Sequence, residues 1–271
     1  MNRERQPAAP PARIAVAGRH VEVATWPSPV APGEPPLVLL HEGLGSVSTW
    51  RDVPARLAEA CGRRVIAYSR LGYGASDPAP LPRAVDFMHE EAREHLPRLL
   101  DALSLDRVVL VGHSDGGSIA LLHAARHPDR VAALVLEAPH VFVEDLSVAS
   151  IARMRTAYEA TDLRDRLARH HGPNVDVAFR GWNDVWLDPA FRAWNIEACL
   201  PDVTCPLLVL QGLDDEYGTP AQVAAIEAGA AGPVEAHLLE RCGHAPHRDR
   251  PDAFFALVPP FVARAAPGPS A

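Results

Sequence analysis

The chain has 271 residues, a formal net charge of −8 at pH 7 and a hydrophobic content of 48%. These values are typical of a single α/β domain with a large core, and an acidic balance without a basic stripe argues against nucleic acid as a partner. All 26 basic residues are arginine, so Schiff-base chemistry and a P-loop lysine are excluded.

The four cysteines, Cys61, Cys199, Cys205 and Cys242, form no C-x-x-C pair. Neither a zinc site nor a redox motif is therefore expected. Residues 1–11 carry charge and proline but no apolar signal-peptide segment, and no apolar run approaches membrane-spanning length. We expect a cytoplasmic protein with free thiols, a disordered segment over 1–11, and no membrane, metal or cofactor. The oligomeric state stays open.

Strands and helices alternate through the first half of the chain. Two alternating stretches, 13–16 and 21–26, flank Gly18 and predict an antiparallel hairpin. Strands are then predicted at 37–41, 64–68, 108–111 and 131–137, with helices over 50–60, 87–103 and 119–125. Strands that alternate with helices imply a mostly parallel sheet covered by helices on both faces.

The alternation stops between residues 141 and 202, where helix-periodic, charged sequence carries Trp182, Trp186 and Trp194. This stretch predicts a helical lid inserted over the sheet. Strands return at 206–211 and 234–239, with helices over 220–228 and 251–264. We expect a core made of 12–140 and 203–265, a lid of 141–202 and a frayed tail over 266–271.

The segment Gly112-His113-Ser114-Asp115-Gly116 lies between a predicted strand and a predicted helix. A direct strand-to-helix turn bends the backbone sharply, and the two glycines let neighbouring backbone pass close to the apex. Ser114 is then presented at a helix N-terminus, where free N–H groups favour developing negative charge. G-x-S-x-G in this setting is typical of a nucleophile elbow.

A serine hydroxyl needs a general base and an orienting acid before it attacks a carbonyl at neutral pH. In a parallel sheet such groups lie at the carboxyl ends of strands. Three consecutive acids, 214–216, follow one predicted strand, and His244 follows the last one. Glu137, one strand earlier, and His247 remain open as the alternative acid and base.

These motifs together resemble the α/β-hydrolase superfamily, in a serine-nucleophile, carboxylesterase-like form with a helical cap. The resemblance covers nearly the whole chain, and its matching segments are His41-Glu42-Gly43-Leu44-Gly45, the loop 69–76, the elbow 112–116, Gly212-Leu213-Asp214-Asp215 and Gly243-His244. It implies an α/β-hydrolase fold with a lid, and a triad of Ser114, Asp215 and His244.

The resemblance also implies an oxyanion hole made by the backbone N–H groups of Asp115 and Gly43, with Leu44 as the next choice for the second donor. The chain departs from the family pattern at Glu42, where glycine is usual. This carboxylate either holds its loop or contacts a polar group of the substrate.

Besides Glu42, five side chains are candidates for the substrate pocket: His140, Trp182, Asn183, Trp186 and Tyr217. The tryptophans also fit the core of a lid, and His140 also fits an ordinary loop. The expected reaction is hydrolysis of a small carboxylic ester through an acyl-enzyme on Ser114. A carbon–carbon bond hydrolase, a lactonase or a thioesterase with the same triad stays open, as does a ligand receptor on a hydrolase fold.

Overall fold

The computed structural model describes residues 10–28 and 33–267. Within them one sheet has the order β1-β2-β4-β3-β5-β6-β7-β8. Its strands are β1 (Ala12–Val16), β2 (Arg19–Trp26), β3 (Leu37–Leu40), β4 (Val65–Ser69), β5 (Val108–His113), β6 (Val131–Glu137), β7 (Leu207–Gly212) and β8 (Val234–Leu239). β2 is antiparallel to β1 and β4, and the other neighbours are parallel. The expected mostly parallel sheet and the N-terminal hairpin are confirmed.

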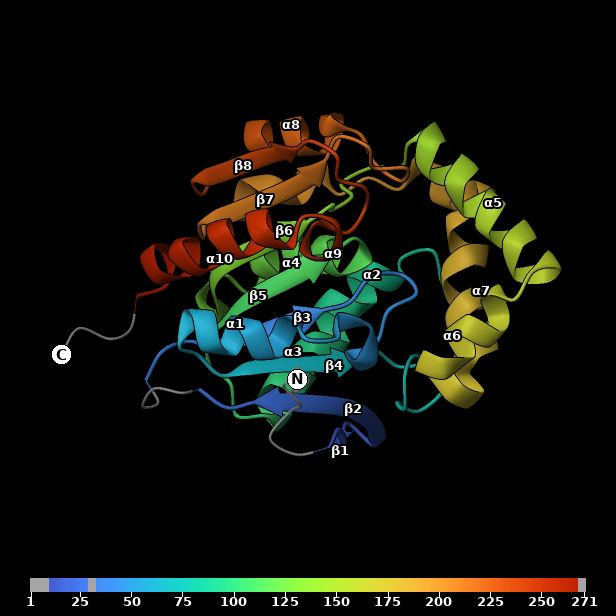
Figure 1. Ribbon diagram of the computed structural model, residues 1–271, viewed down its shortest axis with the longest axis horizontal. Coiled ribbons are helices and arrows are strands. Elements are labelled where there is room, and N and C mark those ends of the chain that lie inside the picture. Colours follow the sequence, from blue (N-terminus) through green and yellow to red (C-terminus); the bar gives the residue numbers. More distant parts are fainter. Residues whose placement is uncertain (1–9, 29–32, 268–271) are drawn as a thin grey trace.

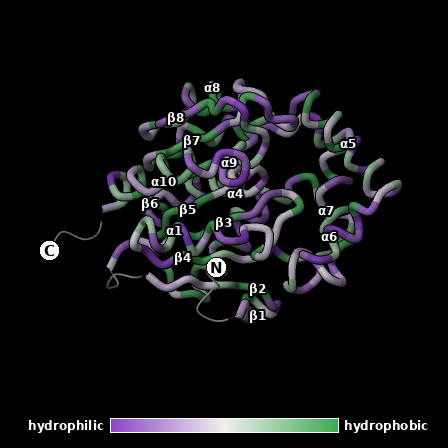
Figure 2. Tube along the Cα trace, viewed as in Figure 1, coloured by the Kyte–Doolittle hydropathy of each residue, from purple (hydrophilic) through white to green (hydrophobic). Residues whose placement is uncertain are grey.

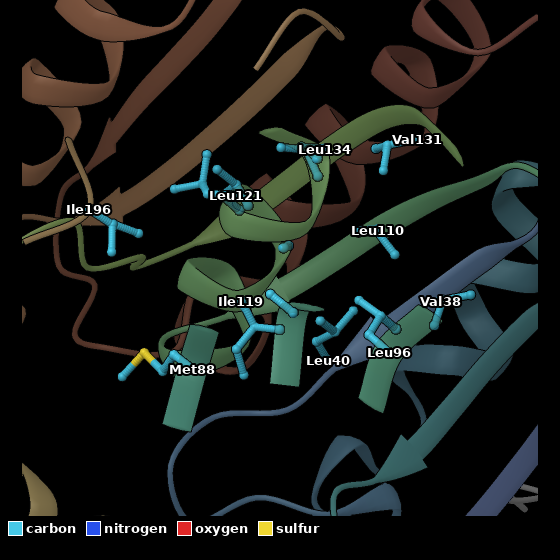
Figure 3. Close-up of a cluster of buried hydrophobic side chains, with 14 of the residues drawn as sticks. Val38, Leu40, Met88, Leu96, Leu110, Ile119, Leu121, Val131, Leu134 and Ile196 are labelled. Atoms are coloured by element: carbon cyan, nitrogen blue, oxygen red, sulfur yellow. The ribbon is translucent and has the colours of Figure 1, made fainter. Parts of the chain in front are cut away.

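The central strands are buried on both faces of the sheet. In β5, Val109 and Val111 join one apolar cluster, while Val108 and Leu110 join the other. This division follows from the two-residue period of a strand, which sends successive side chains to opposite faces. Figure 2 shows much of the central sheet as hydrophobic. Figure 3 shows Leu110 in the cluster that also contains Val108. Burial of one such side chain stabilises the fold by about 1.5–3 kcal/mol.

Helices cover the two faces of the sheet (Figure 1). α1 (Val53–Cys61) and α10 (Pro251–Ala265) pack on one face, where they share an apolar cluster with strand residues. α4 (Asp115–Arg126) and α8 (Pro220–Gly229) pack on the other face. The short α9 (Pro246–Asp249) precedes α10. These layers hold the strand ends in place around the site described below.

Two predicted helices differ from the observed ones. The segment expected as one helix over 87–103 contains α2 (Phe87–Glu90), a π-helical turn η2 (Glu91–His95) and α3 (Leu96–Ala102). Pro97 has no N–H to donate to the preceding turn, which explains why the regular helix is interrupted just before it. The helix expected over 50–60 is preceded by a 3-10 turn, η1 (Val47–Trp50), and begins only with α1.

Residues 141–202 are helical where a lid was expected. They contain α5 (Asp145–Ala160), α6 (Leu163–His171), η4 (Gly172–Asn174), α7 (Val175–Trp186), η5 (Pro189–Ala193) and η6 (Glu197–Asp202). Figure 1 shows α5, α6 and α7 beyond the carboxyl ends of the parallel strands. Among residues 10–28 and 33–267, no helix has the length and apolar character of a membrane-spanning segment.

The two predicted ends of the chain fall mostly outside the described residues. The expected disordered segment, 1–11, is described only from residue 10, and the expected frayed tail, 266–271, only up to residue 267. Ala266 is buried, and its carbonyl accepts a hydrogen bond from the buried guanidinium of Arg63 at 2.5 Å. A buried guanidinium needs acceptors, and this carbonyl is one of them, while the expected fraying of 266–271 stays a prediction.

Candidate active site

The elbow places Ser114 between β5 and α4 in a strained backbone conformation. Its φ of +53° and ψ of −120° lie in a region that L-residues rarely adopt. A Cβ on Gly112 would lie 2.4 Å from the carbonyl oxygen of Gly116, and a Cβ on Gly116 would lie 2.1 Å from that of Leu40. Both positions therefore require glycine, and the turn holds the Ser114 side chain at the N-terminus of α4.

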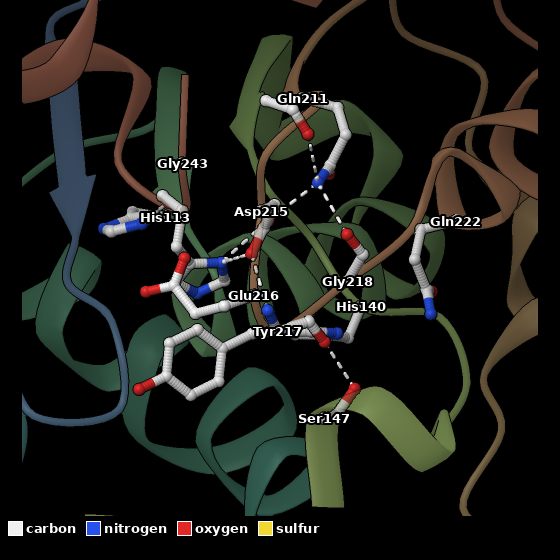
Figure 4. A network of polar contacts seen from close by, with 12 residues as sticks. His113, His140, Ser147, Gln211, Asp215, Glu216, Tyr217, Gly218, Gln222 and Gly243 are labelled. Atoms are coloured by element: carbon white, nitrogen blue, oxygen red, sulfur yellow. Dashed lines mark hydrogen bonds and ion pairs between the residues drawn. The ribbon is translucent and has the colours of Figure 1, made fainter. Parts of the chain in front are cut away.

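His244 contacts Asp215 across the carboxyl ends of β7 and β8. The imidazole Nδ1 lies 2.9 Å from both carboxylate oxygens, so Nδ1 donates and Nε2 is left to act as an acceptor. Asp215 also accepts hydrogen bonds from the Tyr217 N–H and from Gln211 Nε2, both at 2.7 Å (Figure 4). Burial opposes ionisation of Asp215, but its bonds to His244, Tyr217 and Gln211 outweigh burial and lower its pKa.

Ser114 and His244 line the same cavity, which has a volume of about 250 Å³. The hydrogen bonds of the described residues include none between the Ser114 hydroxyl and His244, so the two residues share a cavity rather than a direct bond. Seven other predicted site residues also line this cavity: Glu42, Gly43, Leu44, His140, Trp182, Trp186 and Tyr217. The fold thus gathers residues from both halves of the chain around one hollow.

Asn183 is not among the residues that line the cavity, which corrects the expectation that it contacts substrate. Its Nδ2 donates to the Ile151 carbonyl at 2.9 Å, and its Oδ1 accepts from Arg155 Nε at 2.8 Å. Because both ends of the buried amide are bonded to α5, Asn183 joins α7 to α5 inside the helical segment. The sequence pattern alone does not say which side of α7 this residue occupies.

The two tryptophans of α7 contact the loop and the helix that would supply the oxyanion hole. A Cβ on Gly43 would lie 2.2 Å from Trp182 Nε1, so the indole covers this glycine closely. Trp186 Nε1 donates to Asp115 Oδ1 at 3.2 Å. Asp115 is fully buried, and burial raises the pKa of its carboxyl. Its backbone N–H opens α4, where the first N–H groups have no partner within the helix.

The alternative acid and the alternative base pair with each other. Glu137 Oε2 accepts from the His247 backbone N–H at 2.8 Å and contacts His247 Nδ1 at 3.0 Å. Burial opposes ionisation of Glu137, but the contacts with His247 lower its pKa. The acid that contacts His244 is therefore Asp215, and Glu137 with His247 forms a second carboxylate–imidazole pair.

Glu42 faces the buried imidazole of His113. In the sequence, His113 is only a member of the elbow motif. Glu42 Oε2 lies 3.6 Å from His113 Nδ1, and His113 Nε2 contacts the His244 carbonyl oxygen at 2.6 Å. Burial opposes a charged His113, but Glu42 raises its pKa to about 9, and the pKa of Glu42 is held far below its usual range. The positive charge of His113 therefore compensates the negative charge that Glu42 places near the expected oxyanion site.

His140 is neutral and presents an imidazole to the cavity. Burial lowers its pKa to about 3, with a further contribution from His244, whose ring centre is 5.8 Å away. Among the described residues, His140 Nδ1 has no hydrogen-bond partner. A neutral imidazole at this position is able to exchange a hydrogen bond with a bound molecule.

A family model described as alpha/beta hydrolase fold matches residues 35–176, more than half of the chain. The chain therefore belongs to the α/β-hydrolase family, and it is a hydrolase. It is 30% identical over 256 residues to a 2-hydroxymuconate semialdehyde hydrolase from a Pseudomonas species, covering 85% of this chain and 87% of the relative.

A 2-hydroxy-6-oxo-2,4-heptadienoate hydrolase from Pseudomonas putida is also 30% identical over 254 residues, covering 84% of this chain and 89% of that one. Among solved structures, an enol-lactonase from Burkholderia xenovorans is similar, with a TM-score of 0.70 and 24% identity. The match covers 93% of this chain and all of the lactonase. At that identity the lactonase supports the fold alone.

Proposed function

We propose that this hydrolase cleaves a small molecule at a carbonyl group, with Ser114 as the nucleophile, His244 as the general base and Asp215 as the orienting acid. The observation that carries the proposal is the contact of Asp215 with His244 at 2.9 Å, because this imidazole lines the same cavity as a serine at a strained elbow. The free Nε2 of His244 is the acceptor that a serine nucleophile requires.

In this proposal, His244 Nε2 takes the hydroxyl proton while Ser114 Oγ bonds to the carbonyl carbon. Asp215 keeps Nδ1 protonated and stabilises the imidazolium that forms. The backbone N–H groups of Asp115 and Gly43 donate to the oxyanion, and removing one such donor typically costs ~3 kcal/mol. The imidazolium then protonates the leaving group, and water hydrolyses the acyl-enzyme.

We infer that the bond broken is a carbon–carbon bond beside the carbonyl. The two hydrolases named above support this choice, since both names describe substrates with an aldehyde or ketone and no ester. Cleavage leaves the electron pair on carbon, so the leaving group must delocalise that charge before His244 protonates it. Ester hydrolysis, the reaction expected from the sequence, needs the same three side chains and is the second candidate. A small-molecule substrate and a cytoplasmic location remain part of the proposal.

The test compares 2-hydroxy-6-oxo-2,4-heptadienoate with 4-nitrophenyl butyrate as substrates of the wild type, Ser114→Ala and Ser104→Ala. The control residue Ser104 lies just before β5, at the edge of the sheet opposite the elbow. We expect kcat/KM at least ten times higher for the dienoate, a loss of at least about 10³-fold in Ser114→Ala, and wild-type rates in Ser104→Ala.

Cleavage of the butyrate alone would favour the ester candidate over the carbon–carbon reaction. Substantial turnover by Ser114→Ala would show that this serine is not the nucleophile.

A further inference from the structure

A buried arginine, Arg70, contacts the loop that would supply the second donor of the oxyanion hole. Arg70 directly follows β4 and is only 1% exposed. Its guanidinium donates to two backbone carbonyls, from Nη1 to His41 at 2.5 Å and from Nη2 to Glu42 at 3.0 Å. Both carbonyls belong to the loop that follows β3. The side chain therefore joins this loop to the carboxyl end of β4.

The Glu42 carbonyl belongs to the same peptide group as the Gly43 N–H. This peptide is trans, and in a planar trans peptide the C=O and N–H bonds point in opposite directions. Because Arg70 lies on the carbonyl side, the Gly43 N–H is directed away from it. Gly43 lines the catalytic cavity, and within residues 10–28 and 33–267 its N–H donates to no protein acceptor. The bond to Arg70 thus fixes the orientation of a peptide whose N–H remains available at the cavity.

The Glu42 carbonyl accepts hydrogen bonds from two further groups. His41 Nε2 accepts the Arg70 backbone N–H at 3.1 Å, so the proton is on Nδ1, which donates to the Glu42 carbonyl at 2.7 Å. Burial lowers the pKa of His41 well below its usual range, and the charge of Arg70 lowers it further, so the ring is neutral at pH 7. The Gly45 N–H donates at 3.1 Å. Donors to a carbonyl polarise its peptide and strengthen the N–H on the other side.

Arg70 carries its positive charge in the interior without a contacting carboxylate. Among the described residues it forms no ion pair, whereas Arg63, which is also buried, pairs with Glu34 at 2.6 Å. Two buried acids, Asp115 and Glu91, raise the pKa of Arg70 from beyond ion-pair distance. A buried cation without a contacting partner is costly. Negative charge that develops on a carbonyl oxygen in the neighbouring cavity is stabilised by such a cation.

We propose that Arg70 is a positioning residue for the oxyanion hole, because it holds the peptide between Glu42 and Gly43 so that the Gly43 N–H donates to the oxyanion. The inference rests on the proposed function and adds a residue that does not contact the substrate. Arg70 does not line the catalytic cavity, so its effect reaches the oxyanion through this peptide and through its charge. Loss of Arg70 should therefore weaken binding of the transition state and spare binding of the substrate.

A trifluoromethyl ketone measures the oxyanion hole directly. The Ser114 oxygen adds to the carbonyl carbon of butyl trifluoromethyl ketone, the π electron pair of the C=O bond moves to the oxygen, and His244 takes the hydroxyl proton. Butyl methyl ketone, which forms no stable adduct, measures binding of the uncharged ketone. In Arg70→Met we expect Ki to rise at least about tenfold for the trifluoromethyl ketone and less than about threefold for the methyl ketone. We expect the same split between a lowered kcat and a nearly constant KM.

Arg63→Met is the matched control. Arg63 is also buried and donates to two backbone carbonyls, those of Pro35 and Ala266, but it lies before β4, at the end of the strand opposite Arg70. Both variants are expected to lose stability in urea unfolding, whereas only Arg70→Met should lose affinity for the trifluoromethyl ketone. Arg70→Lys keeps the charge and a donor, so its Ki should lie between those of the wild type and Arg70→Met.

An unchanged Ki of the trifluoromethyl ketone in Arg70→Met, or an equal loss in Arg63→Met, would overturn the inference. If Arg70→Met does not fold, Arg70→Lys gives the decision with Arg63→Lys as its control, because an ammonium group cannot reproduce the fork of a guanidinium. If the wild type formed no adduct with the ketone, the proposed function and the inference would fail together. An adduct that forms equally well without Arg70 would leave the proposed function standing alone.

Discussion

Replacing Glu42 by glutamine removes the negative charge that faces the buried imidazole of His113. In the intact protein Glu42 raises the pKa of His113 from 6.5 to about 9, against the effect of burial. A tenfold change in proton affinity is worth about 1.4 kcal/mol, so this rise corresponds to about 3 kcal/mol of stability. In Glu42→Gln the buried imidazole loses its counter-charge and should be neutral at pH 7.

The dependence of this stability on pH follows from the raised pKa of His113 and the lowered pKa of Glu42. A raised pKa of His113 contributes fully below about 6.5, and its contribution is lost as the pH rises through about 9. The lowered pKa of Glu42 contributes above its ordinary value of 4.5 and is lost as the pH falls below it. The stability difference between wild type and Glu42→Gln should therefore be largest near pH 5–6.5 and should decline on both sides.

Urea unfolding at a series of pH values measures this difference, and nuclear magnetic resonance of labelled histidine follows the charge of His113. Glu94→Gln is the control, since it removes the carboxylate of a surface ion pair with Arg98 that is worth at most about 1 kcal/mol. Equal unfolding midpoints for wild type and Glu42→Gln at pH 6 would refute the reasoning, as would a His113 that titrates near 6.5 in the wild type.

Three further substitutions test the site and its support. Asp215→Asn should lower kcat by about 10³–10⁴-fold while circular dichroism stays unchanged, because the catalytic imidazole loses the carboxylate that fixes its tautomer and stabilises its protonated form; a loss under tenfold would contradict this role. Gly116→Ala should lose about 3 kcal/mol or more of unfolding free energy, since its Cβ would lie 2.1 Å from the Leu40 carbonyl oxygen; a wild-type melting temperature would contradict the packing. Trp186→Phe should lower the free energy of unfolding by about 1–3 kcal/mol, because it removes the donor to buried Asp115. Thermal unfolding measures this loss, and an unchanged melting temperature would show that the bond does not contribute.

The elbow and the parallel sheet were predictable because their signals are local. Runs of valine and leucine on both faces predict buried strands, and the glycines at 112 and 116 are required by backbone contacts within and beside one turn. The π turn before Pro97 was missed although its cause is local, because helical periodicity continues across it.

The family resemblance paired Asp215 with His244, whereas the pairing of Glu137 with His247 appears only in the tertiary structure. Glu137 ends the buried strand β6 and Asp215 follows the buried strand β7, and they are separated from their imidazoles by 110 and 29 residues. A side-chain pattern reports which face of an element is buried, whereas a contact between distant segments depends on how the sheet and helices pack.

Local sequence patterns were enough to predict the class of fold and the types of residue at the carboxyl ends of its strands, because hydrophobic periodicity and turn chemistry act over a few neighbours. The packed structure was needed to show that Asn183 joins two helices of the segment 141–202 and that Glu42 faces His113. Direction and distance between side chains arise when separate elements are packed against one another, and no single stretch of the chain carries that information.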